Sequence, residues 1–207
     1  MTQSGNRPTK EDSPILLLDA MDTLVVDPFF TVFPRFFGCS LPELFKDKDP
    51  NAWIRFEKNE IDEDTWAATT FSDQREFDLD ALKAELFAAY RFIDGIESLL
   101  SDLVDEGVAM HILSNYPLWY QEIESRLKIS RWVPWTFVSW HLGVRKPDAA
   151  IFEHAASHLQ VAPERLIFVD DRESNCEGAR AVGLDAIRFE SAAQLRTALT
   201  ARGVLSC

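Results

Sequence analysis

Four groups of polar residues, each directly after a short apolar run or between two such runs, carry side chains that could do chemistry together. The groups are Asp19-Ala20-Met21-Asp22-Thr23, Ser114-Asn115, Arg145-Lys146-Pro147-Asp148 and Asp170-Asp171-Arg172. Their carboxylates, hydroxyls and lysine suit the binding of a cation and of a charged oxygen group. Any one group is compatible with a turn or a helix cap. Four of them at strand ends indicate one shared site, because ligands of open α/β sheets bind outside the carboxyl ends of the strands.

The elements that must position these groups are short apolar strands that alternate with helical segments. The expected strands lie at 15–18, 109–113, 137–138, 166–169 and 186–189. Helical spacing of apolar residues is found at 96–103, 119–127, 149–159 and 176–182. Such alternation is typical of a parallel sheet covered on both faces. The pattern therefore predicts a doubly wound, Rossmann-like α/β core.

One segment, 28–93, breaks this alternation. It has no clear buried strand, is rich in aromatic and charged residues, and places Leu79, Leu82 and Leu86 at helical spacing. We therefore expect a small α-helical cap inserted after the first strand. The predicted division is a core of 14–27 and 94–207, a cap of 28–93 and a flexible tail of 1–13.

The charge of the chain limits its partners. There are 21 Lys and Arg residues against 34 Asp and Glu residues, for a formal charge of −13. We expect no nucleic acid and no membrane partner, because both are polyanions. The three cysteines form no disulfide or zinc pattern. Residues 1–13 contain no secretory signal. No stretch approaches the roughly 18 apolar residues of a membrane-spanning helix. We expect a cytoplasmic protein, and both monomer and homodimer stay open.

In order and position, the four groups resemble the motifs of the haloacid dehalogenase superfamily, most of whose members are phosphatases. The resemblance covers nearly everything from Ile15 onward, and the inserted segment matches the helical cap of one large branch. It implies that Asp19 is the nucleophile, that Ser114 binds phosphate, and that Lys146 and the acidic pair Asp170-Asp171 complete the site.

The chemistry of these residues agrees with the roles that the resemblance implies. A carboxylate that attacks phosphorus forms an aspartyl phosphate, which water then hydrolyses. Converging carboxylates repel one another, and Mg²⁺ would relieve that repulsion. We expect Asp19, Asp170, Asp171 and the backbone carbonyl of Met21 to hold the ion, and Lys146 to offer its charge to the nucleophile and the phosphate.

Other residues of the same groups are expected to contact the substrate. Thr23 and Ser114 offer hydroxyl donors to the phosphate. Asn115 and Tyr116 follow Ser114 at a strand end, and Tyr116 is placed to stack on an aromatic substrate.

Met21 departs from the common phosphatase pattern, which has a second Asp two residues after the nucleophile as general acid and base. Asp22 lies one residue later. General acid catalysis contributes roughly 10²–10⁴-fold to the reaction rate, so the replacement of this Asp by Met21 matters. Three alternatives stay open: Asp22 carries the proton, another group or water does, or the leaving group needs little help. Asp22 as a simple cap of the turn is open as well.

A narrower resemblance is to the flavin mononucleotide (FMN) hydrolases of plant chloroplasts, which also place Met, Asp and Thr in this order. It rests on Asp27-Pro28-Phe29-Phe30, Phe56-Glu57-Lys58, Ile61-Asp62-Glu63, Asn115 to Tyr120 and Trp135-Thr136-Phe137. The sequence therefore predicts a Mg²⁺-dependent phosphatase of a small phosphorylated metabolite, with FMN as the best guess. The alternatives are a phosphate-binding regulatory protein with weak turnover and, disfavoured by the retained acidic pair Asp170-Asp171, a 2-haloacid dehalogenase.

Overall fold

The computed structural model describes residues 13–206. The tail predicted at 1–13 lies outside the described residues, apart from Ser13. No helix within 13–206 is both long enough and apolar enough to cross a membrane.

Five parallel strands form a single sheet in the order β3-β2-β1-β4-β5. The strands are β1 (Ile15–Leu18), β2 (Met110–Ser114), β3 (Phe137–Val138), β4 (Leu166–Asp170) and β5 (Asp185–Arg188). Within the sheet, Leu18 pairs with Ile112 on one side and with Val169 on the other. The carboxyl ends of the three central strands therefore lie level, which brings the residues that follow them to one edge.

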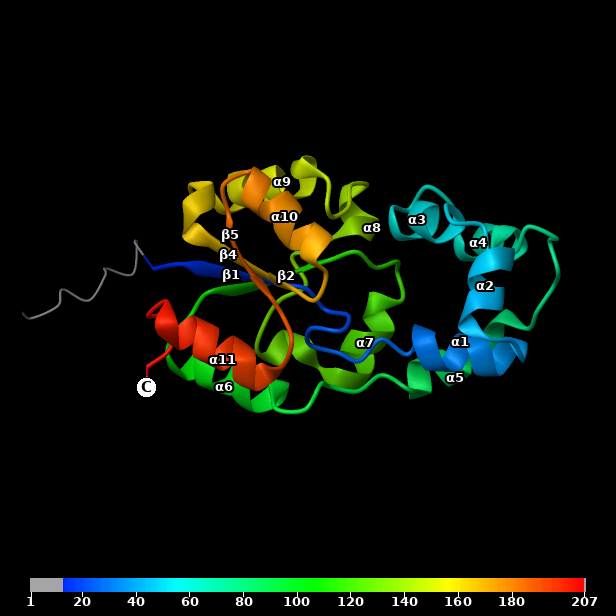
Figure 1. Cartoon of the computed structure of the whole chain (residues 1–207), viewed down its shortest axis with the longest axis horizontal. Helices are drawn as coiled ribbons and strands as arrows, with labels where there is room; N and C mark the ends of the chain where they lie inside the picture. The colour runs from blue at the N-terminus through cyan, green and yellow to red at the C-terminus, as the bar shows by residue number, and fades with distance from the viewer. Residues whose placement is uncertain (1–12, 207) are drawn as a thin grey trace, which may run out of the picture.

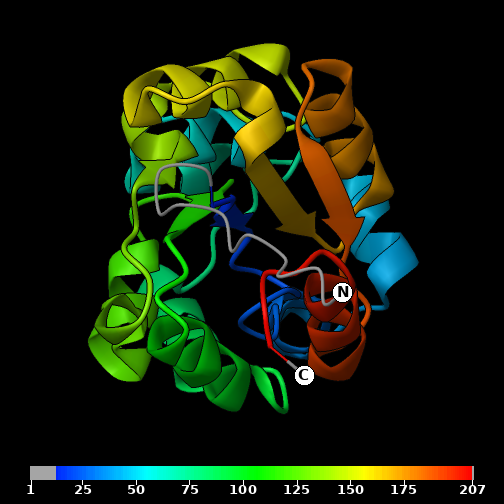
Figure 2. The same ribbon diagram turned by 90° about the vertical axis from the view of Figure 1, so that its left-hand side faces the viewer.

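Helices cover both faces of the sheet, because successive side chains of the central strand point in opposite directions. Leu16 and Leu18 pack into one apolar cluster and Leu17 into the other. In Figure 2, α9 (Ala149–Leu159) and α10 (Glu173–Ala181), in yellow and orange, lie above the sheet, and α6 (Ile96–Asp105) and α11 (Ala192–Ala201), in green and red, lie below it. The predicted doubly wound core is confirmed.

The shorter elements of the core are α7, α8 and two 3₁₀ turns. Their bounds are α7 (Tyr120–Leu127), α8 (Ser139–Leu142), η1 (Ile129–Arg131) and η2 (Pro163–Arg165). Two of the five predicted strands match the observed bounds and the other three differ by one residue, and the helix expected to begin at Cys176 begins at Glu173.

The segment 28–93 folds into helices that stand beyond the carboxyl ends of the strands, at the right of Figure 1. These are α1 (Phe29–Phe37), α2 (Leu41–Asp47), α3 (Ala52–Glu57), α4 (Glu63–Thr69) and α5 (Leu79–Ala88). Side-chain caps begin two of them: Asp62 accepts from Thr65 N at 2.8 Å and Asp78 accepts from Ala81 N at 2.9 Å. We retain 28–93 as the proposed extent of the cap.

Aromatic side chains form the centre of this cap. Trp66 is fully buried, and its ring centroid lies 5.6 Å from those of both Phe56 and Trp53. Aromatic pairs at such distances add to the apolar area that they bury. The aromatic content of this segment therefore serves the packing of the cap, which is continuous with the apolar cluster on one face of the sheet, as well as the site described next.

Candidate active site

Three carboxylates from two strand ends converge at one edge of the sheet. Asp19 follows β1, Asp170 is the last residue of β4, and Asp171 comes next in the chain. One carboxylate oxygen from each lies within 4.8 Å of the others. The sequence-predicted acidic residues are thus brought together.

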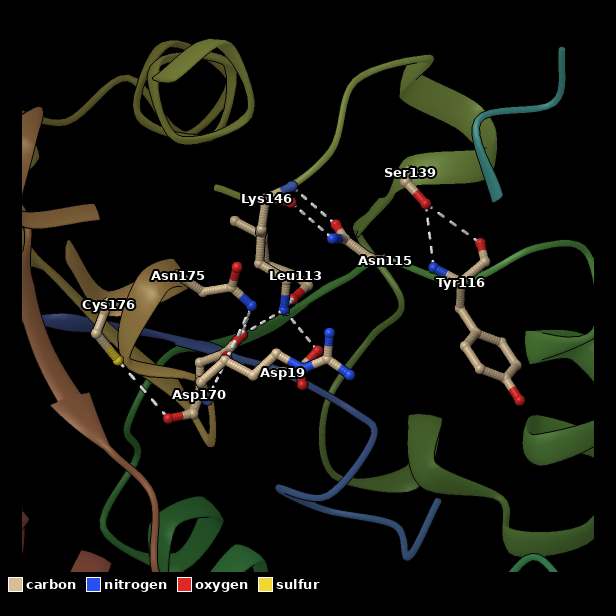
Figure 3. Close-up of polar contacts among 10 residues, drawn as sticks. Asp19, Leu113, Asn115, Tyr116, Ser139, Lys146, Asp170, Asn175 and Cys176 are labelled. Carbon is tan, nitrogen blue, oxygen red and sulfur yellow. Dashed lines mark hydrogen bonds and ion pairs between the residues drawn. The ribbon is translucent and has the colours of Figure 1, made fainter. Parts of the chain in front are cut away.

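Lys146 lies between two of these carboxylates and is 1% exposed. Its Nζ donates to Asp19 Oδ1 at 2.6 Å, to Asp170 Oδ2 at 2.6 Å and to Leu113 O at 2.9 Å (Figure 3). All three donors of the ammonium group are therefore used. A buried charge requires such compensation.

Two asparagines and one backbone amide hold this cluster in place. Asn115 Nδ2 donates to the carbonyl of Lys146 at 2.9 Å, and the amide of Lys146 donates back to Asn115 Oδ1 at 2.8 Å. Asn175 Nδ2 donates to both oxygens of Asp170, at 2.9 and 3.0 Å, and Arg172 N donates to Asp170 Oδ1 at 2.8 Å. Asn115 therefore positions Lys146 as well as lining the cavity.

The electrostatics of the cluster indicate a surplus of negative charge. Burial, opposed by the charge of Lys146 and reinforced by that of Asp170, raises the pKa of Asp19 to about 7. Burial and the charge of Asp170 raise the pKa of Asp171. For Lys146, burial favours a lower pKa, but the carboxylates of Asp170 and Asp19 outweigh it and raise the pKa. The cluster thus holds three carboxylates and one lysine, which pairs with only two of them. Three carboxylates form an oxygen donor set that suits a hard divalent cation.

Two predicted phosphate ligands, Thr23 and Ser114, are fully buried. Within residues 13–206, neither hydroxyl oxygen has a hydrogen-bond partner. Neither side chain lines the cavity described below. Buried hydroxyls are usually hydrogen-bonded, so the hydroxyls of Thr23 and Ser114 can each still form a hydrogen bond.

Asp22 adopts a left-handed backbone conformation with φ of 52°. Its amide donates to Val25 O at 2.7 Å, and its Oδ1 accepts from Asp27 N at 2.9 Å. The carboxylate of Asp22 therefore caps the turn after β1, which is one of the alternatives that the sequence left open. Asp22 and Met21 both line the cavity.

Tyr116 is buried where the core meets the cap. Its hydroxyl lies 2.8 Å from that of Tyr90, its ring centroid lies 5.9 Å from that of Trp53, and its amide donates to Ser139 Oγ at 3.0 Å. Burial raises the pKa of Tyr116 well above its ordinary range, so the hydroxyl stays neutral.

A cavity of about 430 Å³ separates the carboxylate cluster from the cap. This volume lies within the usual range of small-molecule sites. Its core side is polar and charged, and its cap side is largely aromatic. The cap side is lined by Phe29, Phe30, Phe33, Phe45, Lys48, Pro50, Trp53, Ile54, Glu57 and Leu86.

Sequence reasoning missed an ion pair between cap and core. Glu57, at the end of α3, is 2% exposed and accepts from Arg145 Nε. The carbonyl of Glu57 also accepts from Ser139 Oγ at 2.7 Å. These bonds fasten α3 to the loop that carries Lys146. Glu57 and Arg145 are 88 positions apart in the sequence. The only feature of the sequence that could have drawn attention to this pair is that Arg145 directly precedes Lys146.

Asp27 is a second residue that sequence reasoning did not select. It lines the cavity, and its Oδ1 accepts from Phe29 N at 2.9 Å at the start of α1. Burial raises its pKa to about 6.

Comparison with known proteins identifies the family to which this chain belongs. The model of a family described as haloacid dehalogenase-like hydrolase matches residues 31–183. The chain is 42% identical over 195 residues to a protein named flavin mononucleotide hydrolase 1, chloroplastic, from Arabidopsis thaliana, and the match covers 94% of this chain and 80% of that relative.

Solved structures share the fold. An enzyme of the haloacid dehalogenase family from Bacteroides thetaiotaomicron, in complex with magnesium and inorganic phosphate, has a TM-score of 0.67 at 18% identity and covers 86% of this chain and 95% of its own. A phosphatase of that family from Thermococcus onnurineus has a TM-score of 0.64 at 18% identity, over 90% of this chain and 97% of its own. The predicted family is confirmed: the chain belongs to the haloacid dehalogenase-like hydrolases and is an enzyme of the phosphatase type.

Proposed function

We propose that this phosphatase hydrolyses FMN, a small phosphorylated metabolite, through an aspartyl-phosphate intermediate. The observation that carries the proposal is the cluster of Asp19, Lys146 and Asp170, of which Asp19 and Lys146 line the floor of a cavity whose opposite wall is aromatic. The floor suits a phosphate, and the wall suits a flat ring. The printed name of the Arabidopsis relative supports the choice of FMN.

We propose Mg²⁺ as the cofactor. The carboxylates of Asp19, Asp170 and Asp171 fit such an ion, because their oxygens lie within 4.8 Å of one another and share a surplus of negative charge. The backbone carbonyl of Met21 is the fourth proposed protein ligand. Bound Mg²⁺ would supply charge neutralisation for the phosphoryl oxygens.

The proposed reaction has two displacements at phosphorus. Asp19 attacks, a bond from its carboxylate oxygen to phosphorus forms, and the bond from phosphorus to the leaving oxygen breaks. Water then attacks the aspartyl phosphate and releases inorganic phosphate. Throughout, Lys146 offers positive charge beside the nucleophile, and the hydroxyls of Ser114 and Thr23 donate to the phosphoryl oxygens.

The remaining substrate contacts are proposed for two residues of the cavity wall. Asn115 keeps Lys146 in position and faces the cavity, and Tyr116 offers its ring beside that of Trp53. A flat leaving group between the phosphate site and the cap would lie against this wall.

The leaving oxygen needs a proton, and we propose Asp22 as its carrier because its carboxylate lines the cavity where the family pattern is interrupted by Met21. Loss of a general acid slows poor leaving groups most. Asp22→Asn should therefore reduce kcat/KM for FMN by about 10²–10⁴-fold and leave acetyl phosphate within about tenfold of wild type. Equal effects on both substrates would rule Asp22 out, and Asp27→Asn, measured alongside, tests the neighbouring carboxyl.

The test of the function is phosphate release from a panel of FMN, sugar phosphates and acyl phosphates, with and without EDTA. We expect Mg²⁺-dependent turnover of FMN and none by Asp19→Asn. Full activity of that variant, or in excess EDTA, would contradict the mechanism. Met21 favours a second candidate, a phosphate-binding regulatory protein, and Mg²⁺-dependent binding of FMN without release would support it. Release of halide from 2-haloacids would point to dehalogenation.

We further propose a cytoplasmic location and a monomer or homodimer. The name of the Arabidopsis relative places that protein in the chloroplast. Cell fractionation and size-exclusion chromatography would test both proposals.

A further inference from the structure

One cation on the cap side of the cavity is left without an acceptor. Lys48 lies in the turn between α2 and α3 and lines the cavity. Within residues 13–206, no carboxylate oxygen lies within 4 Å of its Nζ and no acceptor lies within hydrogen-bond distance of it, whereas backbone bonds hold the turn itself.

The other cations of the cavity are committed or lie at the phosphate end. Lys146 is shared by Asp19 and Asp170, and Arg145 is paired with Glu57. Arg172 lines the cavity beside Asp171, and its backbone amide donates to Asp170 Oδ1 at the floor. Lys48 is therefore the cation that faces the part of a ligand farthest from its phosphate.

Aromatic rings fix the position of the Lys48 ammonium group. Its Nζ lies 4.6 Å from the ring centroid of Phe29, 5.8 Å from that of Phe33 and 5.9 Å from that of Trp53. Cation–π contacts of this kind attract the charge and use none of its three N–H donors in conventional hydrogen bonds. The ammonium is thus held beside an aromatic wall with its donors available to the cavity.

The surroundings of Lys48 also favour a ligand acceptor. Burial lowers its pKa to about 8, and the charges of Asp27 and Glu57 oppose that shift. A partly buried ammonium without acceptors is costly, and an acceptor brought by a ligand would recover that cost.

We propose that Lys48 is a specificity-determining residue that donates to oxygen or nitrogen acceptors on a planar ring of the leaving group, while the ring packs among Phe29 and Trp53. This inference rests on the proposed phosphatase function and deepens it. The substrates that it selects are phosphate monoesters whose alcohol carries a flat heterocycle with carbonyl oxygens or ring nitrogens, and the isoalloxazine of FMN has both. Phosphates without such a ring would gain nothing from Lys48.

The test compares Lys48→Met with Lys46→Met, a matched control on the exposed side of α2. Substrates are FMN, adenosine and uridine monophosphates, glycerol 3-phosphate and acetyl phosphate. We expect Lys48→Met to raise KM for ring-bearing substrates by about 10- to 100-fold, the range for one hydrogen bond to a charged donor. We expect the ringless substrates and the Lys46→Met variant to stay within about twofold of wild type, and Lys48→Arg to recover part of the loss.

Riboflavin binding, measured by quenching of flavin fluorescence, gives a readout that needs no catalysis. Lys48→Met should weaken it about as much as it raises KM for FMN. Equal effects of Lys48→Met on ring-bearing and ringless phosphates, or no effect, would overturn the inference. So would wild-type turnover confined to ringless phosphates. A wild-type protein that releases phosphate from no substrate would instead contradict the proposed function, and riboflavin binding would still decide the role of Lys48.

Discussion

Replacing the proposed nucleophile should remove activity and yet stabilise the metal-free fold. In Asp19→Asn the amide oxygen can still accept from Lys146 Nζ, but one of the three crowded carboxylates is gone. In the wild type, burial, opposed by Lys146, and the charge of Asp170 raise the pKa of Asp19 to about 7, against an ordinary value of 3.8. The folded protein thus binds this proton more tightly than the unfolded chain, so the free energy of unfolding falls as pH rises through this interval.

The size of this loss of stability follows from the difference between the pKa of Asp19 in the folded protein and its ordinary value. At about 1.4 kcal/mol per pH unit, the loss of stability from Asp19 amounts to about 4 kcal/mol once the pH exceeds 7. Between pH 5 and pH 8 it amounts to about 2–3 kcal/mol. Asp19→Asn carries no such proton and escapes this loss.

The assay is urea unfolding in EDTA, followed by tryptophan fluorescence, for both proteins at pH 5 and pH 8. The difference in free energy of unfolding between Asp19→Asn and wild type should grow by about 2–3 kcal/mol over this range in favour of the variant. Titrating groups that do not interact with Asp19, such as Asp27, act in both proteins and cancel. A difference that does not change with pH would refute the reasoning, as would a less stable variant at pH 8. Adding Mg²⁺ should narrow the difference in free energy of unfolding, because the wild type keeps all three proposed carboxylate ligands and the variant only two.

Three further substitutions, with Ser139→Ala as a comparison for one of them, test the same site. Lys146→Met leaves two buried carboxylates without their shared cation, and in EDTA it should lower the free energy of unfolding by about 3–5 kcal/mol and abolish phosphate release; an unchanged Tm would contradict this. Ser114→Ala should leave the free energy of unfolding unchanged but reduce kcat for FMN by about 10²–10³-fold. Ser139→Ala, which loses two hydrogen bonds, should instead lower the free energy of unfolding by about 1–3 kcal/mol. Thermal unfolding and phosphate release, measured on both variants, distinguish the catalytic effect from the structural one. Gly178→Ala would place a Cβ 2.5 Å from Pro147 O, so it should destabilise by about 1–3 kcal/mol and lower kcat; wild-type values in both assays would show that the loop gives way freely.

The core and its acidic cluster could be predicted from sequence because both follow from local patterns. Short apolar strands predict a parallel sheet, and a parallel sheet brings the carboxyl ends of its strands to one edge. Asp19 and Asp170 therefore meet even though 151 positions separate them, as their shared contact with Lys146 shows. The roles given to these residues came from family resemblance, and the structure adds their geometry.

The cap and its contacts could not be predicted in the same way. Its helices are short and pack around Trp66 and Phe56 in an arrangement that aromatic content alone does not specify. Lys48 and Glu57 look like ordinary surface charges in the sequence, since nothing local shows that one will face a cavity and the other will be buried. For Asp22, the sequence left both a proton carrier and a turn cap open, and the bond from Asp27 N establishes the cap.

The pairing of Glu57 with Arg145, next to Lys146 in the chain, connects the wall of the cavity that we propose selects the substrate with the proposed reaction centre. In that proposal the cap contacts the leaving group, and Lys146, the neighbour of Arg145, holds the nucleophile Asp19. Without Glu57, Arg145 would lose its carboxylate partner, and that arginine directly precedes Lys146 in the chain. A substitution at Glu57 is therefore expected to act at a distance on the lysine of the cluster as well as on the cap side of the cavity.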